Sequence, residues 1–228
     1  MLPLRDNVPT RTRPFVTWGL IVANILVWVL YQLPDLERSV EELAYQPCEV
    51  VHTCAGQAVG QDWPLTALTS MFMHGSWSHL LGNMLFLWIF GNNVEDVLGH
   101  LRYLAFYLAG GFAATALQSA ITLSTGSSAD AAIPNLGASG AVSAVLGAYL
   151  LLLPRAKVLT LIFFILREIP AIAFLGFWFL FQLYSGGASL QRPEEGGGVA
   201  FFAHVGGFVF GFLLIKLVQV RKPLQPRY

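Results

Sequence analysis

Four polar side chains lie within apolar stretches of the sequence, and their types could together carry out nucleophilic chemistry. Ser139 stands between small residues at the start of one stretch, and His204 lies near the start of the last one. An imidazole that takes the proton of a serine hydroxyl makes a weak nucleophile reactive. His79 and Asn83 are four residues apart, hence on one face of a helix, and could donate to the resulting oxyanion. Because polar groups are costly in lipid, each of the four is a candidate functional residue.

The composition predicts that these residues sit in a membrane. Of the 228 residues, 55% are hydrophobic and only 11% are charged, whereas a soluble domain carries about 25% charged residues. The chain lacks the charge to cover a surface in water, so we expect a polytopic membrane protein. Its formal net charge is zero and no run of five or more basic residues occurs, which gives nucleic-acid binding no support.

Six apolar stretches can be drawn, and several are shorter than the roughly 20 residues that cross a bilayer alone. Short, glycine-rich spans that carry polar residues usually pack inside a bundle. We therefore expect an all-α membrane protein with a segment 1–14, a six-helix membrane domain 15–220 that includes a long outer loop at 34–77, and a tail 221–228. The stretches run approximately over 15–33, 79–97, 103–123, 138–153, 169–184 (after a half-apolar lead from 158) and 199–220.

The basic residues predict the orientation of this bundle. With the N-terminus in the cytoplasm, eleven of the thirteen lysines and arginines lie inside, and only Arg38 and Arg192 lie outside. Cytoplasmic loops carry such an excess of positive charge, so we expect both the N- and C-termini to be cytoplasmic. The stretches that hold the four candidate residues then all run from outside to inside, and the candidates share a depth near the outer ends.

Small residues on two of these stretches would allow the serine and the histidine to meet. Stripes of glycine and alanine at helical spacing let helix backbones approach closely. His204 lies at the edge of the small-residue face of the last stretch. Contact between the two helices would therefore bring its imidazole within hydrogen-bond reach of Ser139. The stripes consist of Gly140, Ala144 and Gly147 in the fourth stretch and of Ala203, Gly207 and Gly211 in the sixth.

The same residues also have plain structural explanations. Ser139 could be a packing residue of its stripe, and His204 could be a hydrogen-bonded histidine or a proton relay. His79 and Asn83 could bridge helices. The shared depth favours catalysis, with the backbone N–H of Ser139 at a helix N-terminus as a further oxyanion donor. No acidic residue lies at that depth, which predicts a Ser–His dyad rather than a triad.

Four motifs, in this order along the chain, resemble those of the rhomboid family of intramembrane serine proteases. By this resemblance Ser139 corresponds to the nucleophile and His204 to the base. His79 and Asn83 correspond to the pair that supports the oxyanion. Gly137 corresponds to the glycine two residues before the serine and is expected with them at the oxyanion site. The motifs are GASG at Gly137–Gly140, HGSWSHLLGN at His74–Asn83, GNNVEDVLG at Gly91–Gly99 and AHVGGFVFG at Ala203–Gly211.

The chain departs from the family pattern at two places. Family members often carry an aromatic residue four positions after the nucleophile, where it stacks on the histidine, and here that position is Ser143. Many members also have Trp-Arg in the first outer loop, where this chain has Trp63-Pro64. Neither departure removes a catalytic group, but the first leaves His204 without its usual neighbour.

The resemblance implies cleavage of peptide bonds in or beside transmembrane segments, through an acyl-enzyme that water hydrolyses from the outer face. The expected partners are transmembrane protein substrates and the lipid bilayer, with no metal, cofactor or nucleic acid, and the oligomeric state is left open. By family analogy, the short termini suggest a prokaryotic cytoplasmic (inner) membrane.

Other functions compete with this expectation. A soluble hydrolase elbow needs Gly-x-Ser-x-Gly after a strand, but here a glycine follows Ser139 directly and an apolar helix comes next. A small transporter would show inverted repeats or broken spans in matching halves, and the sequence has none. A catalytically inactive rhomboid-like protein that binds transmembrane clients would lack Ser139 or His204, and both are present.

Two cysteines in the outer loop allow two interpretations. Cys48 and Cys54 are separated by five residues, with His52 between them. Two thiols and one imidazole fall short of the four ligands of a structural zinc site. A local disulfide in an oxidising compartment and two free thiols both fit this spacing.

Overall fold

Six long helical segments make up most of the structure. The computed structural model describes residues 1–54, 62–191 and 200–226, so Arg192 and Arg227 of the orientation argument lie outside the described residues. Each segment coincides with one of the six apolar stretches. They are α1 (Phe15–Leu26), which continues as a π-helical turn (Val27–Gln32), α4 (Trp77–Leu98), α5 (His100–Thr125), α7 (Ser139–Leu152), α8 (Ala171–Gln191) and α9 (Phe201–Val218).

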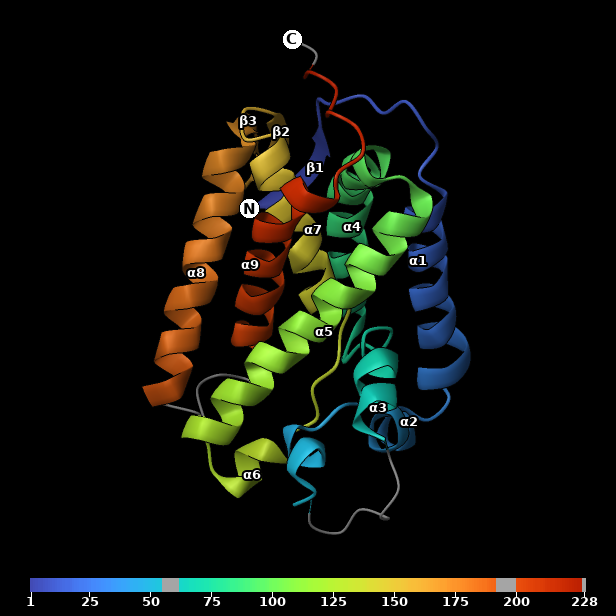
Figure 1. Cartoon of the computed structure of the whole chain (residues 1–228), viewed down its shortest axis with the longest axis vertical. Helices are drawn as coiled ribbons and strands as arrows, with labels where there is room; N and C mark the ends of the chain where they lie inside the picture. The colour runs from blue at the N-terminus through green and yellow to red at the C-terminus, as the bar shows by residue number, and fades with distance from the viewer. Residues whose placement is uncertain (55–61, 192–199, 227–228) are drawn as a thin grey trace.

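The helix α7 is enclosed by the others. In Figure 1, α5 crosses the bundle diagonally in front, α1 and α8 lie at opposite edges, and α7 lies behind α9. Every side chain position from Gly140 to Tyr149 is buried. With 14 residues, α7 is only about 21 Å long, and its polar backbone is shielded by protein rather than by lipid.

Four helical segments in the described part of the chain are long and apolar enough to cross a membrane. The helix α4 is longer than some of these, but it carries Glu95 and Asp96 at its C-terminal end. The four segments are Phe15–Gln32, His100–Thr125, Ala171–Leu190 and Phe201–Val218. They make the chain a multi-pass membrane protein.

The expectation of an all-α fold is wrong in one respect, because the chain also contains a three-stranded antiparallel sheet. Its strands are β1 (Leu2–Asp6), β2 (Lys157–Ile162) and β3 (Ile165–Pro170), in the order β1-β2-β3. The half-apolar lead to the fifth stretch is therefore a hairpin. Val158 and Thr160 of β2 are buried and alternate with less buried neighbours, which is the period of a strand rather than a helix. The segment 1–14 supplies the third strand.

The motif GNNVEDVLG at the end of α4 holds the start of α1. Glu95 is fully buried and accepts hydrogen bonds from the backbone N–H groups of Val16 (2.9 Å) and Thr17 (2.8 Å). The first N–H groups of a helix have no acceptor within the helix, and a carboxylate there also complements the helix dipole. Asp96 likewise accepts hydrogen bonds from backbone N–H groups of the segment just before α1. Arg11 of this segment also forms a 2.8 Å ion pair with Asp96.

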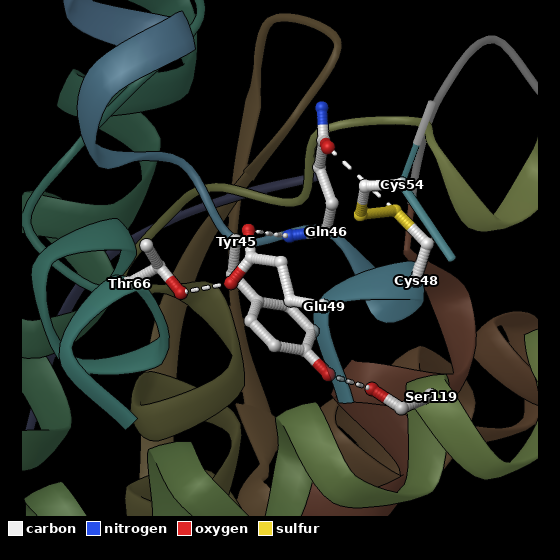
Figure 2. The surroundings of a disulfide bond; sticks show 7 residues. All are labelled: Tyr45, Gln46, Cys48, Glu49, Cys54, Thr66 and Ser119. Carbon is white, nitrogen blue, oxygen red and sulfur yellow. Dashed lines mark hydrogen bonds between the residues drawn. A yellow bond between two sulfur atoms is a disulfide. The ribbon is translucent and has the colours of Figure 1, made fainter. Parts of the chain in front are cut away.

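The outer loop contains short helices and a disulfide. The bond joins Cys48 to Cys54, which decides between the two interpretations of these cysteines. Figure 2 shows Tyr45 beside this bond, with its hydroxyl 2.6 Å from the hydroxyl of Ser119 on α5. The loop elements are α2 (Leu36–Leu43), a 3-10 helix (Pro47–Val51) and α3 (Trp63–Ser70). They lie with α6 (Ser128–Ala131) at the end of the bundle opposite the sheet (Figure 1).

The backbone of Tyr45 ties this loop to the segment that leads into α7. Tyr45 and Asn135 form an isolated antiparallel bridge, with N···O distances of 3.1 and 2.6 Å. The N–H of Gly137 donates to the carbonyl of Ser70 at the end of α3, at 2.9 Å. The outer loop therefore fixes the chain immediately before Ser139.

Small residues bring three helices together rather than two. A Cβ added at Gly207 or Gly211 of α9 would collide with the backbone carbonyls of Gly140 and Ala144 on α7. At Gly140 itself, an added Cβ would lie 2.6 Å from the Cβ of Ala114 on α5. The stripe of α7 therefore faces both α9 and α5. Gly147 is the third contact with α9, where an added Cβ would collide with the carbonyl of Phe208.

Candidate active site

Ser139 is the first residue of α7, at a sharp change of backbone direction. Gly137, two residues earlier, has φ +129°, a conformation that residues with a Cβ rarely adopt. This turn ends the segment held by the outer loop and begins the buried helix. As the first helical residue, Ser139 has a backbone N–H without an acceptor in the helix. That N–H is available to a ligand beside the hydroxyl.

The hydroxyl of Ser139 meets the imidazole of His204. The Oγ atom lies 2.8 Å from Nε2, although the two residues are 65 positions apart. The contact exists because α7 and α9 touch at Gly140 and Gly207, one helical turn or less from the two side chains. This is the geometry in which an imidazole can take the proton of a serine hydroxyl.

The other ring nitrogen of His204 contacts a residue that the sequence analysis did not single out. The Nδ1 atom lies 2.8 Å from Oε1 of Gln182 on α8, whose side chain is 6% exposed. Trp178, one turn earlier on α8, contacts the same ring, with centroids 6.0 Å apart. Ser143 does not reach His204, because its hydroxyl donates to the carbonyl of Ser139 at 2.6 Å. A lone glutamine in a highly apolar stretch is the signal that could have identified Gln182.

His79 and Asn83 lie beside Ser139, on α4. Ser76 caps this helix and accepts a hydrogen bond from the N–H of His79 at 3.1 Å. The ring of His79 lies against Gly137, where an added Cβ would be 2.8 Å from the Nε2 atom of His79. Asn83 is 8% exposed and its Nδ2 has no hydrogen-bond partner in the structure. An unpaired buried amide is costly, so a donor is held ready for an acceptor from outside the chain.

The ring of a second histidine, His74, packs against the ring of His79. The rings of His74 and His79 are in edge-to-face contact, with centroids 5.0 Å apart. Gln32, at the end of the π-helical turn after α1, holds the backbone of His74 through both atoms of its amide, at 2.8 and 2.9 Å. The motif HGSWSHLLGN therefore contributes the wall of the site as well as the candidate donors.

The candidate residues line one cavity of about 640 Å³. Ser139, His204, His79 and Asn83 all contribute to its wall, together with Gln182. Gly137 lies behind His79 and is not among the lining residues of this cavity. The packing residues Gly140, Ala144, Gly147, Gly207 and Gly211 lie at the helix contacts described above. A serine hydroxyl with an imidazole partner, an unpaired amide donor and room for a peptide thus share one space.

Comparison with known proteins gives a consistent family assignment. The profile of the rhomboid domain family matches residues 61–221. The chain is 30% identical over 206 residues to the bovine presenilin-associated rhomboid-like protein, mitochondrial, and this alignment covers 86% of this chain and 47% of that protein. It is 29% identical over 200 residues to rhomboid protein 1, mitochondrial, of Saccharomyces cerevisiae, with 87% and 51% covered. The chain thus spans about half the length of these relatives.

A bacterial relative is also similar over a shorter region. The rhomboid protease GluP of Bacillus subtilis is 33% identical over 138 residues, which are 60% of this chain and 24% of that protein. Because the two relatives with longer alignments are mitochondrial by name, the comparisons do not support the expectation of a prokaryotic cytoplasmic membrane. The family profile covers most of the chain, from the outer loop to the end of α9, and the chain belongs to the rhomboid family.

Proposed function

We propose that this chain is an intramembrane serine endopeptidase that cleaves peptide bonds in or next to transmembrane segments of other proteins. The observation that carries the proposal is the 2.8 Å contact between Ser139 Oγ and His204 Nε2, at the wall of a cavity that also holds the unpaired amide of Asn83. A packing serine would need neither an imidazole partner nor an adjacent unpaired donor. Membership of a family that includes proteases supports the same conclusion.

The proposed reaction uses groups of the protein alone. Ser139 Oγ attacks the carbonyl carbon of the scissile bond while His204 Nε2 takes its proton. The Asn83 amide, the His79 imidazole and the Ser139 N–H donate to the oxyanion. His204 returns the proton to the leaving amine as the C–N bond breaks. Water then enters through the cavity and hydrolyses the acyl-enzyme, with His204 again as the base.

We further propose that all six helices cross the membrane, with both termini cytoplasmic and the cavity toward the outer face. The distribution of basic residues supports this orientation. The disulfide Cys48–Cys54 supports it independently, because disulfides persist in compartments outside the reducing cytosol. The loop that carries it is bonded to the segment before Ser139, so the charge distribution and the disulfide both support an outer position for this end of the bundle.

The substrate would be a helix that unwinds at the cleaved bond. A peptide carbonyl inside a helix is hydrogen-bonded and shielded by its own turn, so Ser139 can reach it only after local unwinding. Glycine and proline weaken helices. Transmembrane segments with such residues, or with small residues such as alanine, near the cut are therefore the proposed substrate class.

The proposal is tested by cleavage of a model single-pass substrate in liposomes. Ser139→Ala should reduce cleavage by at least about 1,000-fold, because residual catalysis without a nucleophile is small. Ser124→Ala is the matched control, since its hydroxyl donates only to the carbonyl of Ile121 at the end of α5, and it should cleave as the wild type does. Equal cleavage by the wild type and Ser139→Ala would refute the nucleophile assignment.

Covalent labelling separates a protease from a client-binding relative. A fluorophosphonate probe should label the wild type at Ser139, and the labelling should be lost in His204→Ala. If the wild type neither cleaves nor reacts with the probe, yet retains a transmembrane client on a column, the inactive client-binding alternative is correct.

A further inference from the structure

The contact between Gln182 and His204 specifies which ring nitrogen carries the proton. A glutamine Oε1 can only accept a hydrogen bond, so the 2.8 Å contact with Nδ1 requires an N–H at that atom. In a neutral imidazole the other nitrogen, Nε2, is then the acceptor. This nitrogen faces the hydroxyl of Ser139, and it must be free of a proton to act as a base.

We propose that Gln182 is a positioning residue, which holds His204 in the reactive tautomer and aims Nε2 at Ser139. This role rests on the proposed function. It adds to the Ser139–His204 pair a third residue that is neither a carboxylate nor an aromatic residue. When His204 takes the proton of Ser139, the Nδ1–H remains bonded to the amide oxygen. A hydrogen bond from a charged donor is stronger than one from a neutral donor, so the contact favours the protonated intermediate.

Residues of α8 contact the ring of His204 and can hold it in position. Ser143 turns back to the carbonyl of Ser139 and does not support the ring. Trp178 and Gln182 lie four residues apart on one face of α8, and both contact the ring. Among the described residues, α7 and α8 contain no charged side chain. His79 is the titratable group that faces His204 from α4.

Two substitutions of similar size test this role. Gln182→Met removes the acceptor and should lower kcat about 10- to 100-fold, by analogy with the loss of groups that orient a metal-binding histidine, while KM changes little. Gln182→Glu restores an acceptor and adds a negative charge. It should keep more activity than Gln182→Met and move the acidic limb of the pH profile of kcat to higher pH, because a carboxylate stabilises the imidazolium.

A substitution on the opposite face of α8 is the control. Leu180 is 65% exposed, and Leu180→Met should leave both kcat and the pH profile unchanged. A merely structural role for Gln182 would lower the melting temperature of Gln182→Met and Gln182→Glu without a shift between their pH profiles, and that result would overturn the proposal.

Histidine NMR distinguishes failure of this inference from failure of the proposed function. Ring-15N spectra of the detergent-solubilised wild type should show a signal for neutral His204 with the proton on Nδ1, assigned by its loss in His204→Ala. The Nδ1–H signal should weaken or disappear in Gln182→Met. This readout needs no substrate, so it remains decisive if the chain proves not to cleave. A wild-type signal with the proton on Nε2 would refute the inference.

The turn between β2 and β3 carries apolar side chains that the rest of the described chain does not cover. Phe163 and Phe164 at this turn are 90% and 98% exposed, and Ile165 and Leu166 of β3 are each more than half exposed. Four consecutive apolar residues without cover are unusual on a surface in water. The strand β3 ends at Pro170 and α8 begins at the next residue, so the hairpin leads directly into a membrane-spanning helix.

We infer that this hairpin turn inserts into the lipid–water interface and anchors the start of α8. Ile172 in the first turn of α8 is also 57% exposed, and exposed Arg167 and Glu168 of β3 lie between it and the turn. Exposed Arg167 directly follows the four apolar residues, and exposed Arg155 precedes β2. Such cations can bind anionic headgroups where apolar side chains enter the interface. Aromatic side chains are enriched at the same depth.

Spin labelling tests the insertion without reference to cleavage. Because Cys48 and Cys54 are joined in a disulfide, a label on Phe164→Cys in liposomes reports one site. It should be more accessible to oxygen than to a water-soluble nickel complex, whereas a label on Glu41→Cys, exposed in α2, should show the reverse. Preferential access of the nickel complex at position 164, or broadening by a label on a second copy, would overturn lipid insertion.

Discussion

At the scale of single residues, the site depends on contacts with neighbouring residues and not only on the presence of a serine and a histidine. The ring of His79 lies only 2.8 Å from the position that a Cβ at residue 137 would take. The amide of Asn83 lacks a partner until an acceptor arrives. Ser139 and His204 would have the same chemistry anywhere on the surface, but these neighbours make the hydroxyl, the base and the donors face one cavity.

Gly137→Ala should therefore impair catalysis more than folding. An added Cβ would lie 2.8 Å from the His79 ring, and φ of +129° is strained for alanine, at a cost of about 1–3 kcal/mol. We expect kcat to fall at least about 100-fold, as when an oxyanion donor is lost, with a modest fall in melting temperature. Gly19→Ala in α1 meets no atom within 4 Å and should leave both quantities unchanged. Full activity of Gly137→Ala would contradict this account of the turn.

At the scale of elements, helix contacts at glycines set the distance between the Ser139 hydroxyl and the His204 imidazole. Gly211 packs against the backbone carbonyl of Ala144, and neither backbone can yield as a flexible side chain would. The sheet makes a different kind of contact. It holds the N-terminal strand against α4 and α7, so that residues before α1 also support the helix that begins at Ser139.

Gly211→Ala should push α9 away from α7. The added methyl would lie 2.6 Å from the carbonyl carbon of Ala144, and overpacking of this kind costs about 1–3 kcal/mol. The free energy of unfolding in mixed micelles should fall by that amount, and kcat should fall with it, because Ser139 and His204 separate. Gly176→Ala in α8, with no atom within 4 Å, should change the unfolding free energy by no more than about 0.5 kcal/mol. Equal stabilities for the two variants would disprove the close contact.

Asp6 of β1 should make stability depend on pH. Its carboxylate accepts hydrogen bonds from the Tyr149 hydroxyl (2.5 Å) and the Asn93 amide (2.8 Å), but burial dominates and raises the pKa of Asp6 from 3.8 to about 6. Folding therefore favours the protonated acid. Its contribution is complete below about pH 4 and is lost as the pH rises through about 6.

The measurement compares the wild type with Asp6→Asn, which cannot titrate at this position. The stability of the wild type relative to Asp6→Asn should increase as the pH falls from 7 to 4, by at most about 3 kcal/mol. Thermal unfolding in detergent at several pH values gives this difference. Parallel curves for the two proteins would show that Asp6 has an ordinary pKa.

At the scale of the whole molecule, the loop that carries the disulfide lies at one end of the bundle and the sheet at the other (Figure 1). Ser139, in the wall of the cavity, begins the helix next to that loop. The loop is bonded to the segment before Ser139, and Asp96 near the other end pairs with Arg11 before α1. The charge bias and the disulfide are independent reasons for the proposal that the two ends lie on opposite sides of the membrane.

Reporter fusions should reveal this orientation. A green fluorescent protein fused after Tyr228 should fluoresce, and alkaline phosphatase at the same point should be inactive, because both report a C-terminus in the cytoplasm when the chain is expressed in a bacterial inner membrane. The same phosphatase inserted after Glu41 in the outer loop should be active. Active phosphatase at the C-terminus would require an odd number of crossings and would refute the six-span proposal.

The sequence by itself determined the membrane class, the six apolar segments and the candidate residues, because burial in lipid leaves a strong compositional signal and polar exceptions stand out. It also indicated that Gly140 and Gly207 would let two helices touch. Only the tertiary structure decided that residues 157–170 form a hairpin with the N-terminal strand, since strand pairing depends on partners more than 150 positions apart. It also decided that Gln182 contacts His204. A hydrogen-bond partner from a separate helix is set by helix packing and rotation, which no local pattern of residues specifies.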